Sequence, residues 1–170
     1  MKGERKIMEG KLRNMTCIYL LKGENIFLLY RQGGKVVNNV WIGSAGGHFE
    51  NYELNDAKAC VLREMNEELG LEPSDIENLM LRYITLRKTN GEIRQNYYFF
   101  ADLKKDLRDD LISNEGVCKW FHLDDIHSLE MPHTAKYVME HYCATGRYTD
   151  KTYIGISNTD KAEFYELSES

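Results

Sequence analysis

The sequence predicts an α+β fold, because strand-like runs outnumber helical ones and most of them form hairpin pairs. Two hairpins are indicated by β-rich runs that flank short turns: 14–22 with 25–31, and 79–88 with 95–103. The second turn contains Asn90-Gly91, and an Asn-Gly pair is a strong signal for a two-residue hairpin loop. Hairpins joined to a few helices favour helices layered on a mixed sheet.

The stretch 55–69 is predicted to be a helix, since apolar residues recur in it at spacings of three and four. Asn55 or Asp56 can cap its start, and Gly70 stands where a C-terminal cap glycine is expected. The remaining expected elements are a loop at 32–40, short strands at 41–44 and 117–122, a helix at about 133–143, and an edge strand at 152–156.

Length and composition restrict the class of protein. The chain has 170 residues, of which 42% are hydrophobic and 29% charged, which fits one globular domain and excludes a fibrous or wholly disordered chain. The formal net charge of −5 argues against a broad grip on polymeric nucleic acid, which needs a positive field. A small anionic ligand stays compatible, because a bound metal ion can reverse the local charge.

Cysteine usage indicates a reducing compartment. Cys17, Cys60, Cys118 and Cys143 contain no CxxC pair, and the first three lie among apolar neighbours, as buried free thiols do. No apolar run approaches the roughly 20 residues of a membrane span. The polar first residues, 1–14, lack the apolar stretch of an export signal. We therefore expect a cytoplasmic protein with no membrane partner.

An acidic cluster on the first helix points to chemistry. Glu64, Glu67 and Glu68 stand at positions i, i+3 and i+4, so their carboxylates share one helix face. They lie in the last turns, where the negative end of the helix dipole disfavours anions. A divalent cation would remove this conflict, and clustered oxygen ligands suit Mg²⁺ or Mn²⁺.

Two plainer interpretations stand beside this one. Acidic helix faces are commonly just solvated surface. Arg63 can reach a loop carboxylate such as Glu53 and fix the loop against the helix, or it can form an ordinary (i, i+4) pair with Glu67. The Gly46-Gly47 loop nearby, where the backbone can approach a ligand closely, favours a functional site.

The stretch resembles the signature of the Nudix hydrolases, G-x5-E-x7-R-E-U-x-E-E-x-G-U, where U is a bulky aliphatic residue. Gly47 and Glu53 match the left half, and residues 63–71 match the right half without a gap. One departure is that nine residues separate Glu53 from Arg63, where the family usually has seven. We place the two extra residues near 54–56, at the junction of loop and helix.

The resemblance implies the Nudix fold, an α/β/α sandwich, and hydrolysis of a nucleoside diphosphate linked to a further group, with Mg²⁺ or Mn²⁺ as cofactor. By position, the metals would be held by Glu64, Glu67 and Glu68 with the carbonyl of Gly46, and Glu64 is also a candidate general base. Glu115 is a weaker candidate for a metal ligand or base, because an exposed loop acid explains it equally well.

The approach to the signature, from Trp41 to Glu50, looks like the sub-group related to MutT, which removes oxidised purine nucleotides such as 8-oxo-dGTP. That likeness implies a triphosphate substrate, cleaved to a nucleoside monophosphate and pyrophosphate. The alternatives are another substrate, such as a nucleotide sugar or a capped RNA end, and a non-catalytic nucleotide-sensing module. Candidate substrate-binding residues are Trp41, His48 and Arg31, each of which also has an ordinary structural explanation.

We expect residues 1–146 to form the Nudix domain and 147–170 to be a C-terminal extension packed on it. The extension could cover the site, add a strand, or join a homodimer.

Overall fold

The computed structural model describes residues 10–33, 38–107 and 110–170. These residues form one eight-stranded mixed sheet in the order β3-β2-β1-β5-β4-β7-β8, with β6 paired to β2. The strands are β1 (Lys11–Lys22), β2 (Asn25–Arg31), β3 (Val40–Ile42), β4 (Ile76–Thr89), β5 (Glu92–Leu103), β6 (Val117–His122), β7 (Thr152–Ser157) and β8 (Ala162–Leu167). The loop expected at 32–40 lies partly outside the described residues, which omit 34–37.

Both expected hairpins are confirmed. β1 pairs antiparallel with β2, and β4 pairs antiparallel with β5. The turn between β4 and β5 places Asn90 and Gly91 at φ angles of 50° and 81°, as a type I′ turn needs at both central residues. Each strand of the second hairpin begins three residues earlier than predicted, and β5 ends at residue 103 as predicted. β5 starts at Glu92 because backbone pairing continues up to the turn whatever the side chains are.

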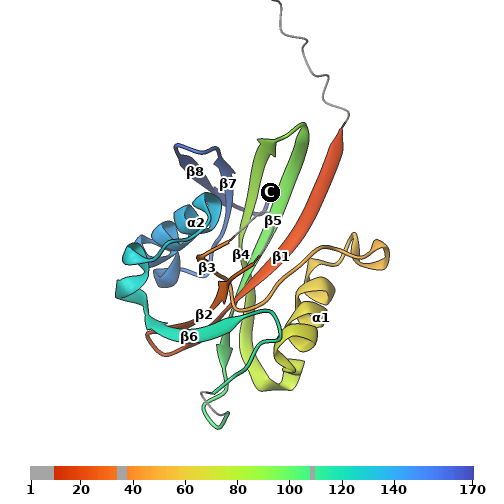
Figure 1. The fold of residues 1–170 in the computed structure, drawn as a ribbon. Coiled ribbons are helices and arrows are strands. Elements are labelled where there is room, and N and C mark those ends of the chain that lie inside the picture. Colours follow the sequence, from red (N-terminus) through yellow and green to blue (C-terminus); the bar gives the residue numbers. More distant parts are fainter. Residues whose placement is uncertain (1–9, 34–37, 108–109) are drawn as a thin grey trace, which may run out of the picture.

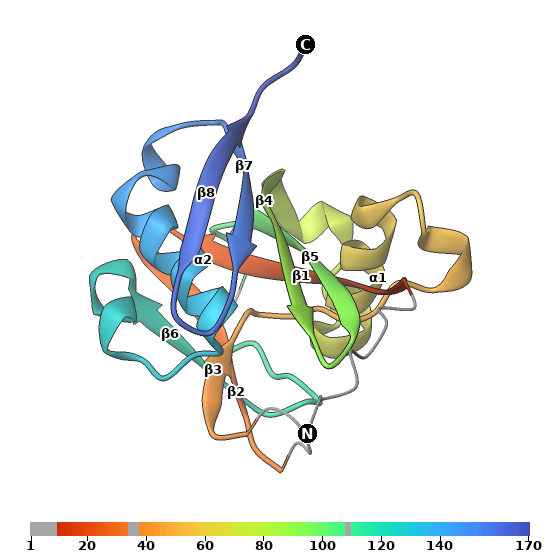
Figure 2. The same cartoon turned by 90° about the horizontal axis from the view of Figure 1, so that it is seen from above.

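The expected α/β/α sandwich is present, with α1 (Ala57–Leu69) on one face of the sheet and α2 (His133–Ala144) on the other (Figures 1 and 2). Alternate residues of β1 pack in the two cores, one on each face of the sheet, since successive strand side chains point to opposite faces. Ile18 and Leu20 pack with Val61 and Met65 of α1. Tyr19 packs with Val138 in the core beneath α2.

Helix α1 is bounded as the sequence indicates. Of the two candidate caps it is Asp56 that accepts a hydrogen bond from the Ala59 backbone amide, at 2.9 Å. Gly70 ends the helix at φ 66°, and its amide bonds to the Asn66 carbonyl. The short 3₁₀ helices are η1 (Asn51–Glu53), η2 (Pro73–Asp75), η3 (Leu123–Ser128) and η4 (Gly146–Tyr148).

The last part of the chain continues the sheet. β7 pairs parallel with β4 after the α2 crossover, and β8 pairs antiparallel with β7. The expectation that 152–156 is an edge strand is wrong, because β8 covers its outer side. The sequence does not predict β8, because its residues, AEFYEL, include as many charged as aromatic side chains and do not alternate between apolar and polar.

A glycine loop fills the place of a strand beside the first half of β1. β2 pairs with β1 only at residues 20–22 of β1. Nearer the start of β1, the segment 45–48 lies along the same edge of that strand. Ile18 donates its backbone amide to Ala45 at 2.9 Å, and Thr16 donates to Gly47 at 2.8 Å. The loop is thereby tied to the sheet and comes to lie next to α1.

Candidate active site

The two loop glycines make close contacts on opposite sides of the loop. Gly46 has φ 155°, and a Cβ there would lie 2.2 Å from the Thr16 carbonyl oxygen. A Cβ on Gly47 would lie 2.3 Å from Oε1 of Glu64. Gly46 has no room for a side chain, because its neighbours are backbone atoms; at Gly47 a side chain would displace the carboxylate of Glu64. With glycine at both positions, the loop backbone lies directly against the acidic face of α1.

Arg63 anchors the preceding loop to the helix through Glu53. Its Nε donates to Oε1 of Glu53 at 2.7 Å, and its Nη2 donates to Oε2 at 3.0 Å. The Glu53 side chain is only 2% exposed. The Arg63 hydrogen bonds, aided by the Glu50 backbone amide, lower the pKa of Glu53 to about 2 against the opposing effect of burial. The two residues that lengthen the segment to Arg63 therefore leave this contact intact.

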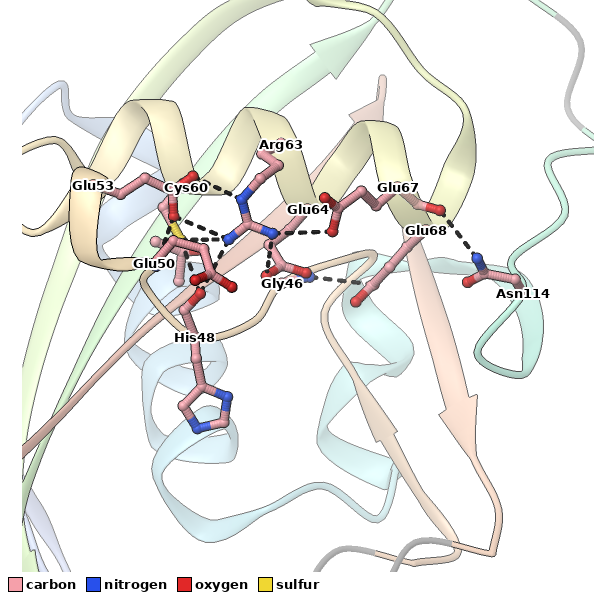
Figure 3. A network of polar contacts seen from close by, with 11 residues as sticks. Gly46, His48, Glu50, Glu53, Cys60, Arg63, Glu64, Glu67, Glu68 and Asn114 are labelled. Carbon is pink, nitrogen blue, oxygen red and sulfur yellow. Dashed lines mark hydrogen bonds and ion pairs between the residues drawn. The ribbon is translucent and has the colours of Figure 1, made fainter.

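Arg63 also joins the acidic cluster. Its Nη1 donates to Glu64 at 2.9 Å and to Glu67 at 3.0 Å, and its Nη2 donates to the His48 carbonyl at 3.1 Å (Figure 3). The loop anchor and the (i, i+4) pair proposed from the sequence are thus both present in one side chain.

Glu68 is the acid of the cluster whose charge is least compensated by neighbouring donors. Its Oε2 accepts the Gly46 backbone amide at 3.3 Å. Burial raises the pKa of Glu68 to about 7; the nearby Glu64 and Glu115 raise it further, and Arg31 lowers it. Burial also raises the pKa of Glu64, partly offset by Arg63. The helix end thus concentrates more negative charge than its own residues neutralise.

The cluster offers the oxygen ligands that a hard divalent cation prefers, and its uncompensated charge fits such an ion. In the described part of the chain, no three acidic, histidine or cysteine side chains are drawn together as a finished metal site. The reason is visible in Figure 3: Glu64 and Glu67 turn toward Arg63, whereas Glu68 turns toward Gly46. Glu67 is 56% exposed and has room to turn.

Arg31 and Glu115 both lie within electrostatic range of Glu68, at the end of α1. The sequence does not predict the role of Asn114, the residue that holds the Glu115 loop at this helix end. The Asn114 side chain donates to the Glu67 carbonyl at 3.0 Å, and its backbone amide donates to the Glu68 carbonyl at 3.3 Å. A lone Asn in a polar loop carries no signal that it will close a helix end 47 residues away.

His48 and Trp41 are not brought to the cluster by their side chains. The His48 imidazole accepts a hydrogen bond from Arg13 at 2.6 Å and points away from the carboxylates (Figure 3). Trp41 packs edge-on against Phe121, with ring centres 4.6 Å apart, and against Tyr30 at 4.9 Å. The structural explanation of Trp41 therefore accounts for the contacts it makes here.

Taken together, the fold and site define an α+β domain that holds carboxylates and an arginine beside a glycine loop, a set of groups suited to cation-assisted chemistry on phosphates. Residues 11–142 match the model of the NUDIX domain, which is most of the chain. The chain belongs to this family and is a Nudix hydrolase. Enzymes of the family generally use divalent metal ions.

Solved structures share the fold at low sequence identity. The MutT protein of Bacillus halodurans is 19% identical, with 93% of this chain and 99% of that chain covered and a TM-score of 0.65. The ORF135 protein of E. coli is 18% identical, with coverages of 81% and 93% and a TM-score of 0.62. A MutT protein from Methanosarcina mazei is 19% identical, with 80% and 96% covered and a TM-score of 0.59. No curated protein matches the chain.

No helix in the described residues is both long and apolar enough to cross a membrane.

Proposed function

We propose that the chain is a Mg²⁺- or Mn²⁺-dependent pyrophosphohydrolase of (deoxy)nucleoside triphosphates, with oxidised purines such as 8-oxo-dGTP as preferred substrates and a nucleoside monophosphate and pyrophosphate as products. The observation that carries the proposal is the crowding of Glu64, Glu67 and Glu68 against the Gly46-Gly47 loop. Nudix hydrolases act on small nucleotide substrates, and the likeness to MutT proteins supports a triphosphate as the substrate.

The metal would be held by Glu64, Glu67 and Glu68, with the carbonyl of Gly46 beside them. The carbonyls on either side of Gly46, those of Ala45 and Gly47, are already bonded to β1. When bound, the ion supplies charge neutralisation at the phosphate oxygens and lowers the pKa of a water. Glu115, which adds to the negative field at Glu68, is a further candidate ligand.

The chain's own residues then have separate tasks. Arg63 and Glu53 hold the loop and helix in register, so that the carboxylates face the glycine backbone. Glu64, which lies directly against Gly47, is the candidate general base that takes a proton from the attacking water. Arg31, near Glu68, is a candidate for contact with phosphate, since a guanidinium donates well to such oxygens.

We further propose that the protein acts in the cytoplasm. All four cysteines are free in the structure. Cys60 is buried as expected, whereas the expectation of burial is wrong for Cys17 and Cys118, which are only partly buried. Free thiols of this kind persist in a reducing compartment.

The test is release of pyrophosphate from a panel of nucleotides with Mg²⁺, comparing normal and oxidised purine triphosphates, nucleotide sugars and capped RNA ends. We expect the oxidised purine triphosphate to show the highest kcat/KM. Cleavage of only a nucleotide sugar would refute the substrate class. Tight binding of a nucleotide without turnover would instead favour the sensing module.

Glu67→Gln should lower kcat by about 10²-fold or more, because one charge that holds the cation is lost at an exposed position that does not support the fold. Glu140→Gln, the same change on the exposed surface of α2, is the matched control and should turn over normally. Unchanged turnover by the Glu67 variant would contradict the proposed site, provided that circular dichroism shows both variants folded.

A further inference from the structure

Three arginines stand in line on one face of the sheet. Arg13 of β1 lies opposite Arg94 of β5, and Arg94 lies opposite Arg87 of β4. Residues directly opposite on paired strands project from the same face. The three strands run side by side in Figures 1 and 2. We call Arg13, Arg94 and Arg87 the arginine row.

The row lies on the α2 side of the sheet. Tyr98 and Tyr83 occur four residues along β5 and β4 from Arg94 and Arg87, and an even separation keeps side chains on the same face. Both tyrosines belong to the core beneath α2. The arginine row therefore continues this face beyond the end of that core, where the sheet passes from apolar to charged side chains.

Such a row is unfavourable by itself, because like charges directly opposite each other on a sheet destabilise it. Burial lowers the pKa of Arg87, and the neighbouring Arg94 lowers it further. The Nε of Arg87 is buried and has no hydrogen-bond partner within the described ranges. A guanidinium that is desolvated, crowded by another and left with an unused donor fits a missing anion.

The acidic compensation in the described residues is limited to one carboxylate. Glu92 accepts a hydrogen bond from Arg94 at 2.8 Å and lies 3.7 Å from Arg13. Lys11, opposite Glu92 in the register, adds another positive charge. On a chain whose net charge is −5, this is a local concentration of the opposite sign.

One residue links the arginine row to the carboxylate cluster. The His48 imidazole accepts the Nε hydrogen bond of Arg13, while the His48 carbonyl accepts a hydrogen bond from Arg63. A substrate that reaches from the carboxylates across His48 would meet the row. Asn96, in the next register position beyond Arg94 on the same face, has a buried Oδ1 with no partner among the described residues.

We propose that the arginine row binds a phosphate group of the substrate that lies beyond the bond hydrolysed at the carboxylates. This inference rests on the proposed function and names its substrate class: a nucleoside diphosphate joined to a group that itself carries phosphate, nucleoside triphosphates included, and not one joined to an uncharged sugar. The planar fork of a guanidinium matches phosphate oxygens, and neighbouring forks select for repeated negative charge.

The first experiment measures anion binding without catalysis. Inorganic tripolyphosphate is titrated by calorimetry into the protein in EDTA, at low and high salt. We expect Arg87→Gln and Arg94→Gln each to weaken binding by about 10- to 100-fold. Lys88→Gln removes the same charge from an exposed neighbour on β4 that faces the other side of the sheet, and should bind like the native chain.

No binding by the native protein, or equal binding by the arginine variants, would overturn the proposal. Thermal unfolding distinguishes a structural role: because Arg87→Gln relieves repulsion between like charges, its midpoint should not fall below that of Lys88→Gln.

The second experiment separates this inference from the proposed function. The ratio of kcat/KM for a triphosphate to kcat/KM for a nucleotide sugar should fall at least about 10-fold in Arg87→Gln and Arg94→Gln and stay constant in Lys88→Gln. If the arginine variants cleave the triphosphate as well as the native protein does, the arginine row does not bind the substrate, and the proposed function still stands. If tripolyphosphate binding depends on the arginine row but the native protein cleaves no nucleotide, the proposed function is refuted and the row is still an anion site.

Discussion

Two acids of the signature, Glu53 in η1 and Glu68 on α1, behave in opposite ways. Glu53 receives both arms of the Arg63 fork, and its pKa falls to about 2. Glu68 receives only one backbone amide and lies near two other carboxylates, and its pKa rises to about 7. Glu53 is the more buried of the two and yet has the lower pKa, so burial alone does not decide the shift. The loop anchor is complete within the chain, whereas the helix end lacks positive charge.

Glu53 and Glu68 belong to the same signature, but Glu53 stabilises the fold and Glu68 is available to a ligand. An acid that the protein has already paired contributes to the fold, and one left crowded is free to serve a ligand. Substitutions that neutralise each acid should therefore change stability in opposite directions.

Glu53→Gln should cause the largest loss, about 3 kcal/mol of unfolding free energy at pH 7, because it breaks a buried ion pair. A depressed folded-state pKa means that the native pair stabilises above the ordinary pKa of a glutamate and loses its effect as pH falls toward about 2. Urea denaturation from pH 7 to pH 2.5 should show the native and variant curves converging in acid.

Glu77→Gln, at an exposed position of β4, controls for the loss of one charge and should stay close to native at every pH. A gap between native and Glu53→Gln that does not narrow in acid would show that the Glu53 pair is not the source of the stability.

Glu68→Gln should act in the other direction in metal-free protein. A raised folded-state pKa means that the carboxyl is tolerated while protonated, and stability is lost as pH rises from about 4.5 through about 7. We expect the variant to be about 2 kcal/mol more stable than native at pH 8 in EDTA and equal to it near pH 4.

Addition of Mg²⁺ should raise the stability of the native protein at pH 8 more than that of Glu68→Gln, since the ion stabilises the state that binds it. Glu140→Gln should follow the native curve throughout. A Glu68 variant that is less stable than native in EDTA at pH 8 would mean that Glu68 is a structural acid like Glu53.

Gly70→Ala should have the smallest effect, a loss of about 1 kcal/mol, because a side chain is strained at φ 66° although nothing lies within 4 Å of the added Cβ. Gly70→Asn should lose less, since asparagine tolerates this conformation. Thermal denaturation of the two variants shows how much of the stability of the helix end depends on backbone geometry and how much on the carboxylates. Equal losses would mean that strain at Gly70 is not the cause.

The sequence was most informative where local rules decide the structure. The Asn90-Gly91 turn, the Asp56 cap and the Gly70 cap all follow from residues within a few positions of one another. β8 could not be predicted, because its pairing with β7 depends on a crossover that first brings β7 beside β4.

The candidate site shows the same division. Helical spacing alone places Glu64, Glu67 and Glu68 on one face, whereas the direction of the His48 imidazole depends on how the loop lies along β1. Asn114 joins the site through the path of a loop, which spacing does not encode.

The glycine loop that replaces a strand beside β1 makes its own position beside the carboxylate cluster measurable by amide exchange. The amide protons of Thr16 and Ile18, deep in the sheet, are shielded from exchange only while the backbone of residues 45–47 stays docked. Two resonances in the middle of the domain would therefore register any detachment of the segment that carries Gly46, in solution and without a bound nucleotide.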